Sequence, residues 1–393
     1  MQSFEFQTTN RIFNEIGGLS RTAEICGELE ISNLLIVTDE GVFNHGLLED
    51  IKSILKQNKI AFEIFKDVEA DPSDQTAINA ANFGKEHKAN GVLGIGGGSA
   101  MDTAKVVSIL LLNKGANTQV HLEDLSPLYG VNQITKPRSP LILVPTTAGT
   151  GSEVTPISIL TTGETTKSGI VSSVLLPDIA ILDASLTLGL PSHITASTGI
   201  DAMVHAIEAY TSKVKKNPYS DMLAKHALLI LSNNIETAVI NGKNLTARQN
   251  MLFGACLAGQ AFANSPVGGV HALAYPLGGH FHVSHGLSNS LVLPHVMRFN
   301  ESHASRMYCD LAEVIMADNM VNCTVTNSTE ILANYFLQLA VSFDLPIKLR
   351  QVGVDDNFLS VLAEDAMKQT RLLVNNPKEM TYEDALRIYQ KAY

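Results

Sequence analysis

Short apolar runs alternate with amphipathic segments along the first half of the chain. The runs are rich in Val, Ile and Leu, and most of them end at glycine or at a polar residue. They lie at residues 34–39, 61–65, 91–96, 141–145 and 177–183. Segments of helical composition follow, from Gly41 to about residue 56, from Asp71 to about residue 87, and onward from Gly98. Strands that alternate with helices pair in parallel, so the pattern predicts an α/β domain.

From His193 onward the pattern changes, because strand-like alternation becomes scarce and helical periodicity dominates. We expect helices at residues 198–210, 217–235, 245–264, 304–316, 329–343, 357–370 and 382–392. A further helix should begin after Pro266 and be disrupted at Pro276 by that proline and the glycines that follow it. The change of pattern predicts a boundary near residue 190, with an α/β domain over 1–190 and an all-α domain over 191–393.

Two shorter stretches carry strand signals of their own. Phe4–Thr9 alternates apolar and polar side chains and precedes Arg11–Gly17, a pair that predicts a short hairpin or an edge strand. Lys167 falls in a short polar segment that we expect to form a hairpin, and we interpret it as a solvated surface charge.

Composition narrows the class of protein. The chain has 45% hydrophobic and 17% charged residues, as globular enzymes do, and its net charge of −11 argues against binding to nucleic acid or to an anionic membrane. We expect no secretory signal, because no basic start precedes an apolar run, and no apolar run reaches the length of a membrane span. The four cysteines form no CxxC pair and fit reduced thiols in a cytoplasm.

A glycine turn is the candidate site for a cofactor phosphate. Gly96, Gly97 and Gly98 lie between a predicted strand and a helix that begins near Ser99. Such glycines let backbone amides approach a pyrophosphate, whose charge the helix N-terminus also favours. The turn lacks the third glycine of the Rossmann fingerprint, and no acidic residue follows it about 20 residues later. The alternative is a tight connection between strand and helix without a ligand.

Asp39 ends an earlier predicted strand and is the candidate ribose ligand. A carboxylate at that place accepts a hydrogen bond from a ribose 2′-hydroxyl and repels a 2′-phosphate, so it favours NAD over NADP. The alternative is an aspartate that only ends its strand, since turns favour this residue.

Metal-ligating residue types gather between Asp201 and His285. Asp201 and His205 are four residues apart in a helical segment and therefore share one helix face. With His271 and His285 they would offer one oxygen and three nitrogens, a set suited to Fe2+, Zn2+ or another divalent metal. The alternatives are scattered polar residues, or His280 or His282 as ligands in place of a later histidine.

The residues around these candidates resemble a known family. The segments 199–210 and 269–278, together with His285-Gly286, look like the two signatures of the iron-containing (group III) alcohol dehydrogenases. The resemblance implies a dehydroquinate synthase-like two-domain fold and the metal ligands Asp201, His205, His271 and His285. It also implies an NAD cofactor, a small alcohol or aldehyde as substrate, and an N-terminal strand that helps to join two subunits in a homodimer.

The resemblance also implies roles for residues outside the metal set. Residues of the loop after the fourth apolar run would touch the pyrophosphate and the nicotinamide ribose, and the motif matches Thr146, Thr147 and Ser152. Asp102 resembles a family acid near the nicotinamide, although a helix N-terminus favours an acid there in any case. Many family members have a histidine four residues after the third ligand, where this chain has Tyr275, which titrates near pH ~10. We also expect His280 to face the substrate.

The combined prediction is a reversible hydride transfer between NAD and a small primary alcohol or diol. The zinc-dependent relatives resembling glycerol dehydrogenase or dehydroquinate synthase use one acid and two histidines, so the pair Asp201 and His205 argues against them. A branch that acts on oxoacids, such as a hydroxyacid-oxoacid transhydrogenase or a maleylacetate reductase, would need a cationic pocket. A sensor that binds NAD and metal without turnover is the alternative outside enzymes.

Overall fold

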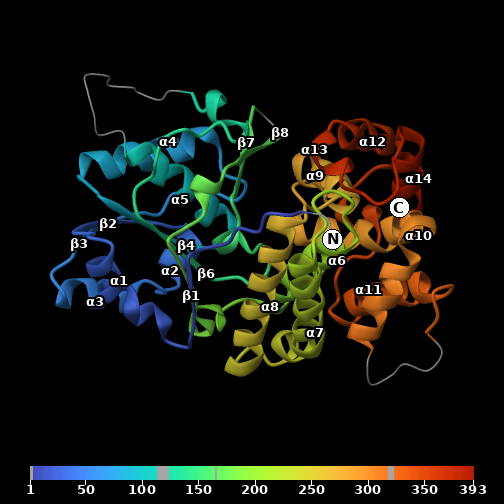
Figure 1. The fold of residues 1–393 in the computed structure, drawn as a ribbon, viewed down its shortest axis with the longest axis horizontal. Coiled ribbons are helices and arrows are strands. Elements are labelled where there is room, and N and C mark those ends of the chain that lie inside the picture. The colour runs from blue at the N-terminus through green and yellow to red at the C-terminus, as the bar shows by residue number, and fades with distance from the viewer. Residues whose placement is uncertain (1–2, 113–123, 164–165, 317–322) are drawn as a thin grey trace. The chain divides into compact units, whose positions relative to one another are not determined.

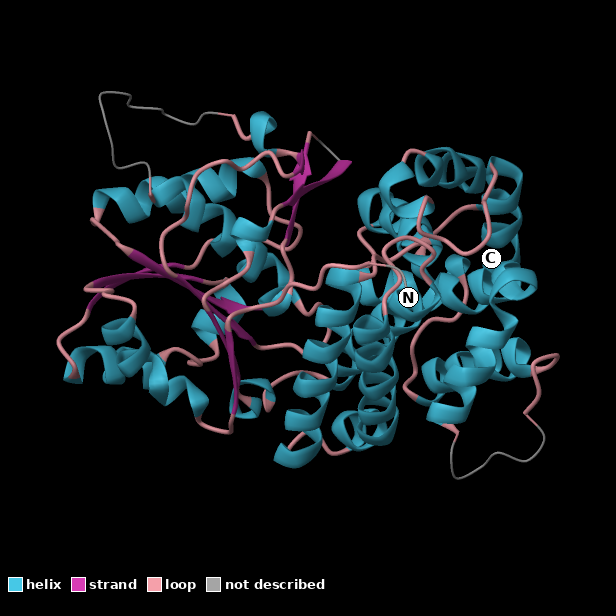
Figure 2. Cartoon of the chain, viewed as in Figure 1, coloured by secondary structure: helices cyan, strands magenta, loops and turns pink. Residues whose placement is uncertain are grey.

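The computed structural model describes residues 3–112, 124–163, 166–316 and 323–393. The chain divides into one unit of Gln7–Thr147 and Gly151–Gly189 and a second of Met1–Phe6, Ala148–Thr150 and Leu190–Tyr393. The first unit contains the strands and the second is helical (Figure 2). The predicted fold class, an α/β domain followed by an all-helical one, is confirmed.

Six parallel strands form the main sheet of the α/β unit, in the order β1-β9-β6-β4-β2-β3. Their bounds are β1 Arg11–Asn14, β2 Asn33–Val37, β3 Ala61–Phe65, β4 Gly91–Gly96, β6 Leu141–Pro145 and β9 Ile179–Leu182. The central strands are buried along their whole length, which is why they read in the sequence as continuous apolar runs.

Helices cover both faces of this sheet (Figure 1). Alternate residues of β2 point to opposite faces, so that Leu35 and Val37 pack with α4 and α5 while Leu34 and Ile36 pack with α1 and α3. The helices of this unit are α1 Thr22–Glu28, α2 Glu40–Asn44, α3 Glu49–Gln57, α4 Asp74–Glu86 and α5 Gly98–Leu111. A second, three-stranded sheet has the order β5-β8-β7, with β5 Gly130–Val131, β7 Ile157–Thr162 and β8 Thr166–Val171. Its antiparallel pair β7 and β8 is the predicted hairpin that carries Lys167.

The helical unit is organised around α6, which is buried along most of its length and packs against α7, α8 and α10. A helix with apolar or small residues on every side, as α6 has, is stable only when neighbours surround it. The helices are α6 Ser192–Thr211, α7 Pro218–Ile240, α8 Leu245–Asn264, α9 Gly269–Phe281, α10 His285–Ile315, α11 Ser328–Ser342, α12 Leu359–Met367, α13 Thr370–Leu373 and α14 Tyr382–Ala392. Across the described ranges, none of the helices combines the length and the apolar character that crossing a bilayer requires.

Of the two alternatives expected at the N-terminus, the edge strand is confirmed: residues 3–9 form no strand and hence no hairpin, whereas β1 is an edge strand that pairs in parallel with β9. Two expectations about the helices were wrong. The segment expected as one helix to residue 56 is two helices, α2 and α3, separated at Gly46 with a φ of 72°. The helix expected at 304–316 is the second half of α10, which continues through Pro294.

Helix α9 also continues where a break was expected. It passes through Pro276 and ends only at Phe281, where His282 adopts the left-handed conformation. Pro276 removes one backbone hydrogen bond, but Leu273, Ala274 and Leu277 around it are buried. The packing of these side chains outweighs the local preference for a break.

Candidate metal centre and cofactor-binding elements

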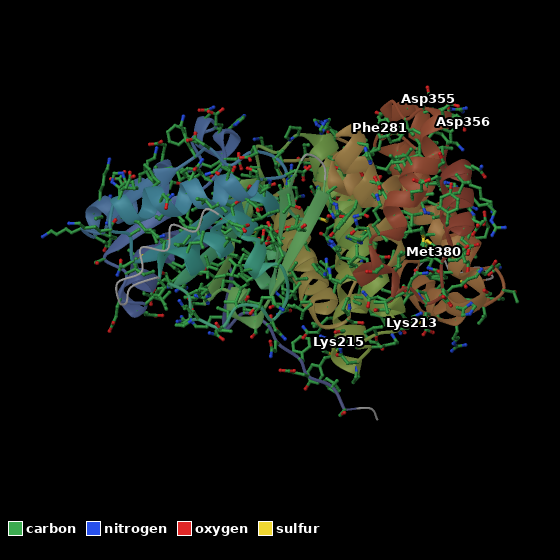
Figure 3. All side chains as sticks on the ribbon, turned by 90° about the horizontal axis from the view of Figure 1, so that it is seen from above. Lys213, Lys215, Phe281, Asp355, Asp356 and Met380 are labelled. Atoms are coloured by element: carbon green, nitrogen blue, oxygen red, sulfur yellow. The ribbon has the colours of Figure 1, made fainter. Side chains whose placement is uncertain are left out.

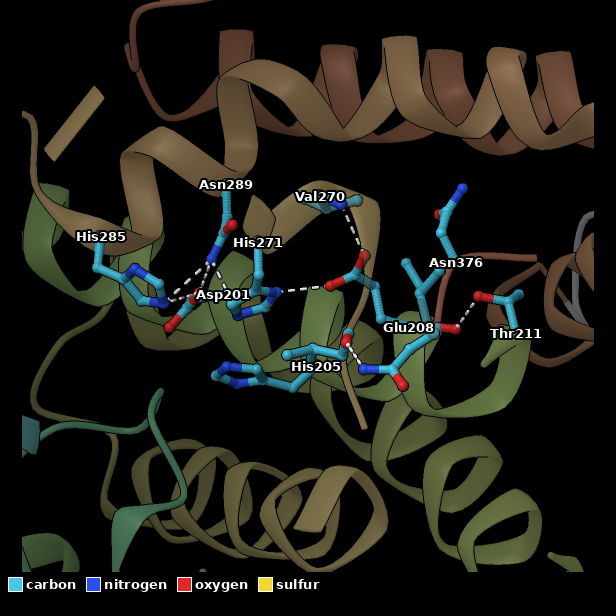
Figure 4. A network of polar contacts seen from close by, with 12 residues as sticks. Asp201, His205, Glu208, Thr211, Val270, His271, His285, Asn289 and Asn376 are labelled. Carbon is cyan, nitrogen blue, oxygen red and sulfur yellow. Dashed lines mark hydrogen bonds and ion pairs between the residues drawn. The ribbon is translucent and has the colours of Figure 1, made fainter. Parts of the chain in front are cut away.

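Three helices bring the four predicted metal ligands together. Helix α6 supplies Asp201 and His205 one turn apart, α9 supplies His271 in its first turn, and His285 is the first residue of α10. One ligand atom from each of the four lies within 4.8 Å of the others. The first three side chains are buried and that of His285 is 32% exposed. Figure 4 shows the four side chains with their polar contacts.

The charge states of the cluster suit a cation. Burial lowers the pKa of His205 to about 4, although the charge of Asp201 acts in the opposite direction, so the imidazole is neutral near pH 7. Burial by itself would raise the pKa of Asp201, but the neighbouring imidazoles and a hydrogen bond from Asn289 outweigh it and lower that pKa. An ionised carboxylate and neutral imidazoles are the forms that bind metal.

Glu208 fixes the orientation of His271. Its Oε2 lies 2.6 Å from His271 Nδ1, and its Oε1 accepts a hydrogen bond of 2.7 Å from the backbone N–H of Val270. A proton on Nδ1 therefore points at a carboxylate, and the lone pair of Nε2 is left for the ligand cluster. Glu208 was not among the residues predicted from the sequence, although it lies seven residues after Asp201 and so returns to the same face of α6.

His205 is oriented in a similar way by the backbone. Its Nδ1 lies 3.2 Å from the carbonyl oxygen of Gly149, and its ring stacks on Phe262 and His271 at centroid distances of 4.4 and 4.8 Å. Gly149 is needed at that position, because a Cβ there would meet Thr198 Cβ at 2.8 Å. A close approach of this loop to α6 thus positions a ligand.

The four residues fit a divalent metal. Ions such as Zn2+ bind nitrogen and oxygen at about 2.0–2.2 Å, which sets neighbouring ligand atoms about 3–4 Å apart in a closed shell. A cluster spanning 4.8 Å reaches that geometry with small side-chain movements. The mixture of one carboxylate and three imidazoles is compatible with Fe2+ and with Zn2+.

Tyr275 lies close to the cluster and His280 lies at the far end of α9. The ring of Tyr275 is 5.8 Å from that of His285. His280 Nε2 lies 2.5 Å from Asp365 Oδ2 on α12, and its ring lies 5.1 Å from that of Phe358. The next residue, Phe281, labelled in Figure 3, packs edge-on against the same Phe358 ring. His280 thus takes part in the contact between α9 and α12.

The predicted phosphate and ribose ligands gather at the carboxyl ends of neighbouring strands of the α/β unit. Gly96 ends β4 with a φ of 154°, and Gly97 is the N-cap residue of α5 and supplies no side-chain cap to the N-terminal amides of that helix. A Cβ on Gly96 would meet Asp39 Oδ2 at 3.1 Å, so this carboxylate lies beside the turn. Asp39 Oδ1 caps α2 by accepting from the N–H of Val42 at 2.9 Å, and Oδ2 remains on the side of Gly96.

Thr146 and Thr147, which follow β6, lie beside the same glycine turn. The backbone N–H of Thr146 donates to the carbonyl of Gly96 at 2.9 Å, and a Cβ on Gly97 would lie 3.7 Å from Thr147 Oγ1. Gly98 and Ser99 form the first turn of α5. Strands β2, β4 and β6 are adjacent in the sheet, so their loops bring these residues to one edge.

Asp102 and Ser152 belong to a buried network around Lys105. The ammonium group of Lys105 lies 3.2 Å from Asp102 Oδ1 and donates to Ser152 Oγ at 2.7 Å and to the carbonyl of Ile157 at 2.5 Å. Ser152 Oγ donates to Asp102 Oδ1, and the N–H of Ile159 donates to Asp102 Oδ2. These contacts tie α5 to β7. Sequence reasoning did not identify Lys105, because a buried lysine has no signal of its own.

Two sequence profiles of one protein family together match nearly the whole chain. The sequence profile described as iron-containing alcohol dehydrogenase matches residues 9–184, and that of the Fe-containing alcohol dehydrogenase family, C-terminal, matches residues 195–393. Long-chain-alcohol dehydrogenase 1 of Geobacillus thermodenitrificans is 37% identical over 377 residues, which cover 96% of this chain and 93% of that protein.

Solved structures are similar as well. A crystal structure of 1,3-propanediol oxidoreductase has a TM-score of 0.93 and 33% identity and covers 100% of both chains. The structure of a sulfoacetaldehyde reductase from Bifidobacterium kashiwanohense in complex with NAD+ has a TM-score of 0.85 and 25% identity, covering 100% of this chain and 99% of the other.

Proposed function

The chain belongs to the iron-containing alcohol dehydrogenase family, and from this premise we propose how its own residues serve the reaction. It is an oxidoreductase, a metal-dependent alcohol dehydrogenase. We assign the metal site to particular residues because a carboxylate and three imidazoles from three helices place ligand atoms within 4.8 Å of one another. We assign nucleotide binding to residues 1–190 and metal binding to residues 191–393.

We propose that Asp201, His205, His271 and His285 hold Fe2+, or Zn2+ or another divalent cation in its place. Such a cation supplies Lewis-acid chemistry, drawing electron density from the oxygen of an alcohol or carbonyl. Glu208 and the carbonyl of Gly149 hold two of the imidazoles by their Nδ1 atoms, which leaves both Nε2 lone pairs directed into the cluster. The buried side of the cluster excludes water and strengthens these interactions.

We propose NAD as the hydride carrier. Gly96–Gly98 and the uncapped N-terminus of α5 suit a pyrophosphate, with Thr146 and Thr147 beside it. Asp39 Oδ2, next to Gly96, suits a ribose 2′-hydroxyl and would repel the phosphate of NADP. The related sulfoacetaldehyde reductase has been solved with NAD+, which supports the choice.

We propose a small primary alcohol or diol, and its aldehyde, as the substrate pair. The similarity to long-chain-alcohol dehydrogenase 1 and to 1,3-propanediol oxidoreductase supports an alcohol and leaves its chain length open. The same similarity weighs against the oxoacid branch and against a sensor without turnover, because both of these relatives are named as oxidoreductases of alcohols.

Loss of the hydroxyl proton requires an acceptor or a path to water. Of the three predicted groups, Tyr275 is the one whose ring lies beside a metal ligand, and we propose it as part of that path. Asp102 is engaged by Lys105, Ser152 and a backbone N–H, and His280 is engaged by Asp365. For these two residues, the contacts favour positioning over proton transfer.

We propose that the protein works as a homodimer in the cytoplasm. Strand β1 is an edge strand of the six-stranded sheet, and an edge of this kind can pair with a strand of a second copy. Cys26, Cys256, Cys309 and Cys323 form no disulfide in the described part of the chain, which fits a reducing compartment.

The test is alcohol-dependent reduction of NAD by purified protein, supplied with Fe2+ or Zn2+, over a panel of C2 to C4 alcohols, diols and hydroxyacids. The substitution His271→Ala should remove metal retention and lower turnover at least about 100-fold, since it deletes a ligand, while NAD still binds. His303→Ala, at an exposed residue of α10, is the matched control and should behave as the wild type. An active, metal-free His271→Ala protein would contradict the proposal.

A further inference from the structure

Asn289 contacts three of the four predicted metal ligands, and no role has been assigned to it so far. It lies on α10 four residues after His285, on the same helix face, and it is fully buried. Its amide nitrogen Nδ2 lies 2.6 Å from Asp201 Oδ1 and 3.3 Å from Nε2 of both His271 and His285 (Figure 4). One amide group thus reaches ligand atoms from all three helices.

The other end of the same amide has no partner among the described residues. Asn289 Oδ1 is buried and makes no hydrogen bond. A buried acceptor left unpaired costs about 1–3 kcal/mol, so an apolar side chain of the same shape would suit the fold better at this place. The side chain is therefore held through its nitrogen alone, by the atoms that would bind a cation.

A bound cation would displace the contacts of Asn289 with the two imidazoles but not its hydrogen bond to Asp201. A neutral imidazole Nε2 has a single lone pair, so it cannot accept from Asn289 and bind a metal at the same time. Those two contacts are long, at 3.3 Å, and little is lost with them. A carboxylate oxygen has further lone pairs, and the hydrogen bond of 2.6 Å to Asp201 is compatible with a cation on the same carboxylate.

We propose that Asn289 is a positioning residue of the metal centre, which sets metal affinity by holding the carboxylate of Asp201 in its binding orientation. The inference rests on the metal site of the proposed function. Hydrogen bonds to a ligating carboxylate fix its direction, and their loss typically weakens metal binding 10- to 100-fold. Asp201 has no other side-chain hydrogen bond among the described residues, and its ion pair with His285 Nε2 is longer, at 3.7 Å. The hydrogen bond from Asn289 is therefore the shortest polar contact that orients this carboxylate.

The experiment compares metal binding by the wild type with that by Asn289→Leu, which keeps the shape, and by Asn289→Ala, which a helix accepts without steric demand. Zn2+ affinity is measured by competition with a chelator, and the coordination geometry is followed by the visible absorption of Co2+-loaded protein. Both variants should bind Zn2+ about 10- to 100-fold more weakly and change the Co2+ spectrum. Unchanged or tighter binding by either variant would overturn the proposal, since it would make Asn289 only a competitor for the lone pairs.

A matched control separates positioning from general loss of packing. Asn300 lies on the same helix and is also buried, but its amide exchanges hydrogen bonds of 2.9 and 2.8 Å with Asn376. Asn300→Leu should lower the melting temperature and keep wild-type Zn2+ affinity and the wild-type Co2+ spectrum. An equal loss of affinity in Asn300→Leu would refute a specific role for Asn289. If the wild type itself binds no metal, the proposed function fails; if all variants bind as the wild type does, only the role of Asn289 fails.

Discussion

The side chain of Glu153 is buried inside the α/β unit, where it interacts electrostatically with Lys105. Burial raises its pKa from 4.5 to about 7, although the lysine acts in the opposite direction. An acid whose pKa is raised on folding holds its proton in the native state at pH values where the unfolded chain has released it. The free energy of unfolding therefore falls as the pH rises from about 4.5 to 7.

This charge state predicts a pH-dependent effect of Glu153→Gln. The variant lacks the titrating group, so its stability relative to the wild type should increase between pH 5 and pH 8, by about 3 kcal/mol if the whole shift is realised. Chemical denaturation across this range measures it. Glu301→Gln, at an exposed position of α10, should leave the pH profile of the wild type unchanged. Parallel profiles of Glu153→Gln and wild type would contradict the assigned pKa.

At the residue scale, chemistry-bearing residues could be identified where type and spacing coincide. Asp201 and His205 were found because four residues make one helical turn, and the glycines before α5 were found because they interrupt an apolar run. Glu208, Asn289 and Lys105 were not, because each acts through a partner far away in the sequence. Asn289, for example, contacts Asp201 across 88 residues, a distance that no local pattern encodes.

At the scale of elements, the crossing of α6 and α10 depends on one glycine. A Cβ on Gly286, the second residue of α10, would lie 2.4 Å from the carbonyl oxygen of Ser197 and 3.2 Å from Asp201 Cβ. The first turn of α10 therefore touches the backbone of α6 directly. This contact brings His285, its neighbour in sequence, to the carboxylate on the other helix.

We expect Gly286→Ala to push the two helices apart. Overpacking of this kind costs about 1–3 kcal/mol of stability, and displacement of His285 should weaken Zn2+ binding about tenfold or more. Thermal unfolding and chelator competition measure the two effects. Gly27→Ala is the control, because Gly27 lies in α1 with nothing within 4 Å of an added Cβ, and it should stabilise by about 0.4–1 kcal/mol. Wild-type metal affinity in Gly286→Ala would show that the contact is dispensable.

Elements were predictable where a buried face imposes a pattern. The five strands from β2 to β9 that the apolar runs indicate all belong to the main sheet, and α8 matches its expected range of 245–264. The errors arose where tertiary packing overrides a local signal, as at Pro276 in α9 and Pro294 in α10. The partner of β1 was missed because parallel pairing with β9 joins the two ends of the unit.

At the scale of the whole molecule, the candidate sites for the metal ion and for NAD lie on different units. The metal residues belong to the helical unit, and the glycine turn with Asp39 belongs to the α/β unit. A ligand that binds only the native state stabilises by mass action, about 2.7 kcal/mol at a concentration 100 times its Kd. Each ligand should slow local opening most in the segments that it contacts.

Hydrogen exchange can separate the two sites in the intact protein. Zn2+ should slow exchange in α6 and in the first turns of α9 and α10, whereas NAD should slow exchange at residues 94–104 and 146–152. His271→Ala should abolish the first response and retain the second. Protection of the helical unit by NAD with none at the glycine turn would contradict the nucleotide assignment.

The pairing of β1 with β9 also bears on how the chain is made. Arg11 lies opposite Ile179, so after its synthesis β1 waits for a partner that lies 168 positions later in the chain. At roughly 5–20 residues per second, synthesis of the intervening chain takes about ten to thirty seconds. For the last part of that interval, the 34 residues from the end of β6 at Pro145 to Ile179 or about 2–7 seconds, the edge of β6 that β9 will cover is open to any extended peptide. Mispairing with a second nascent chain is therefore most favourable before β9 has emerged.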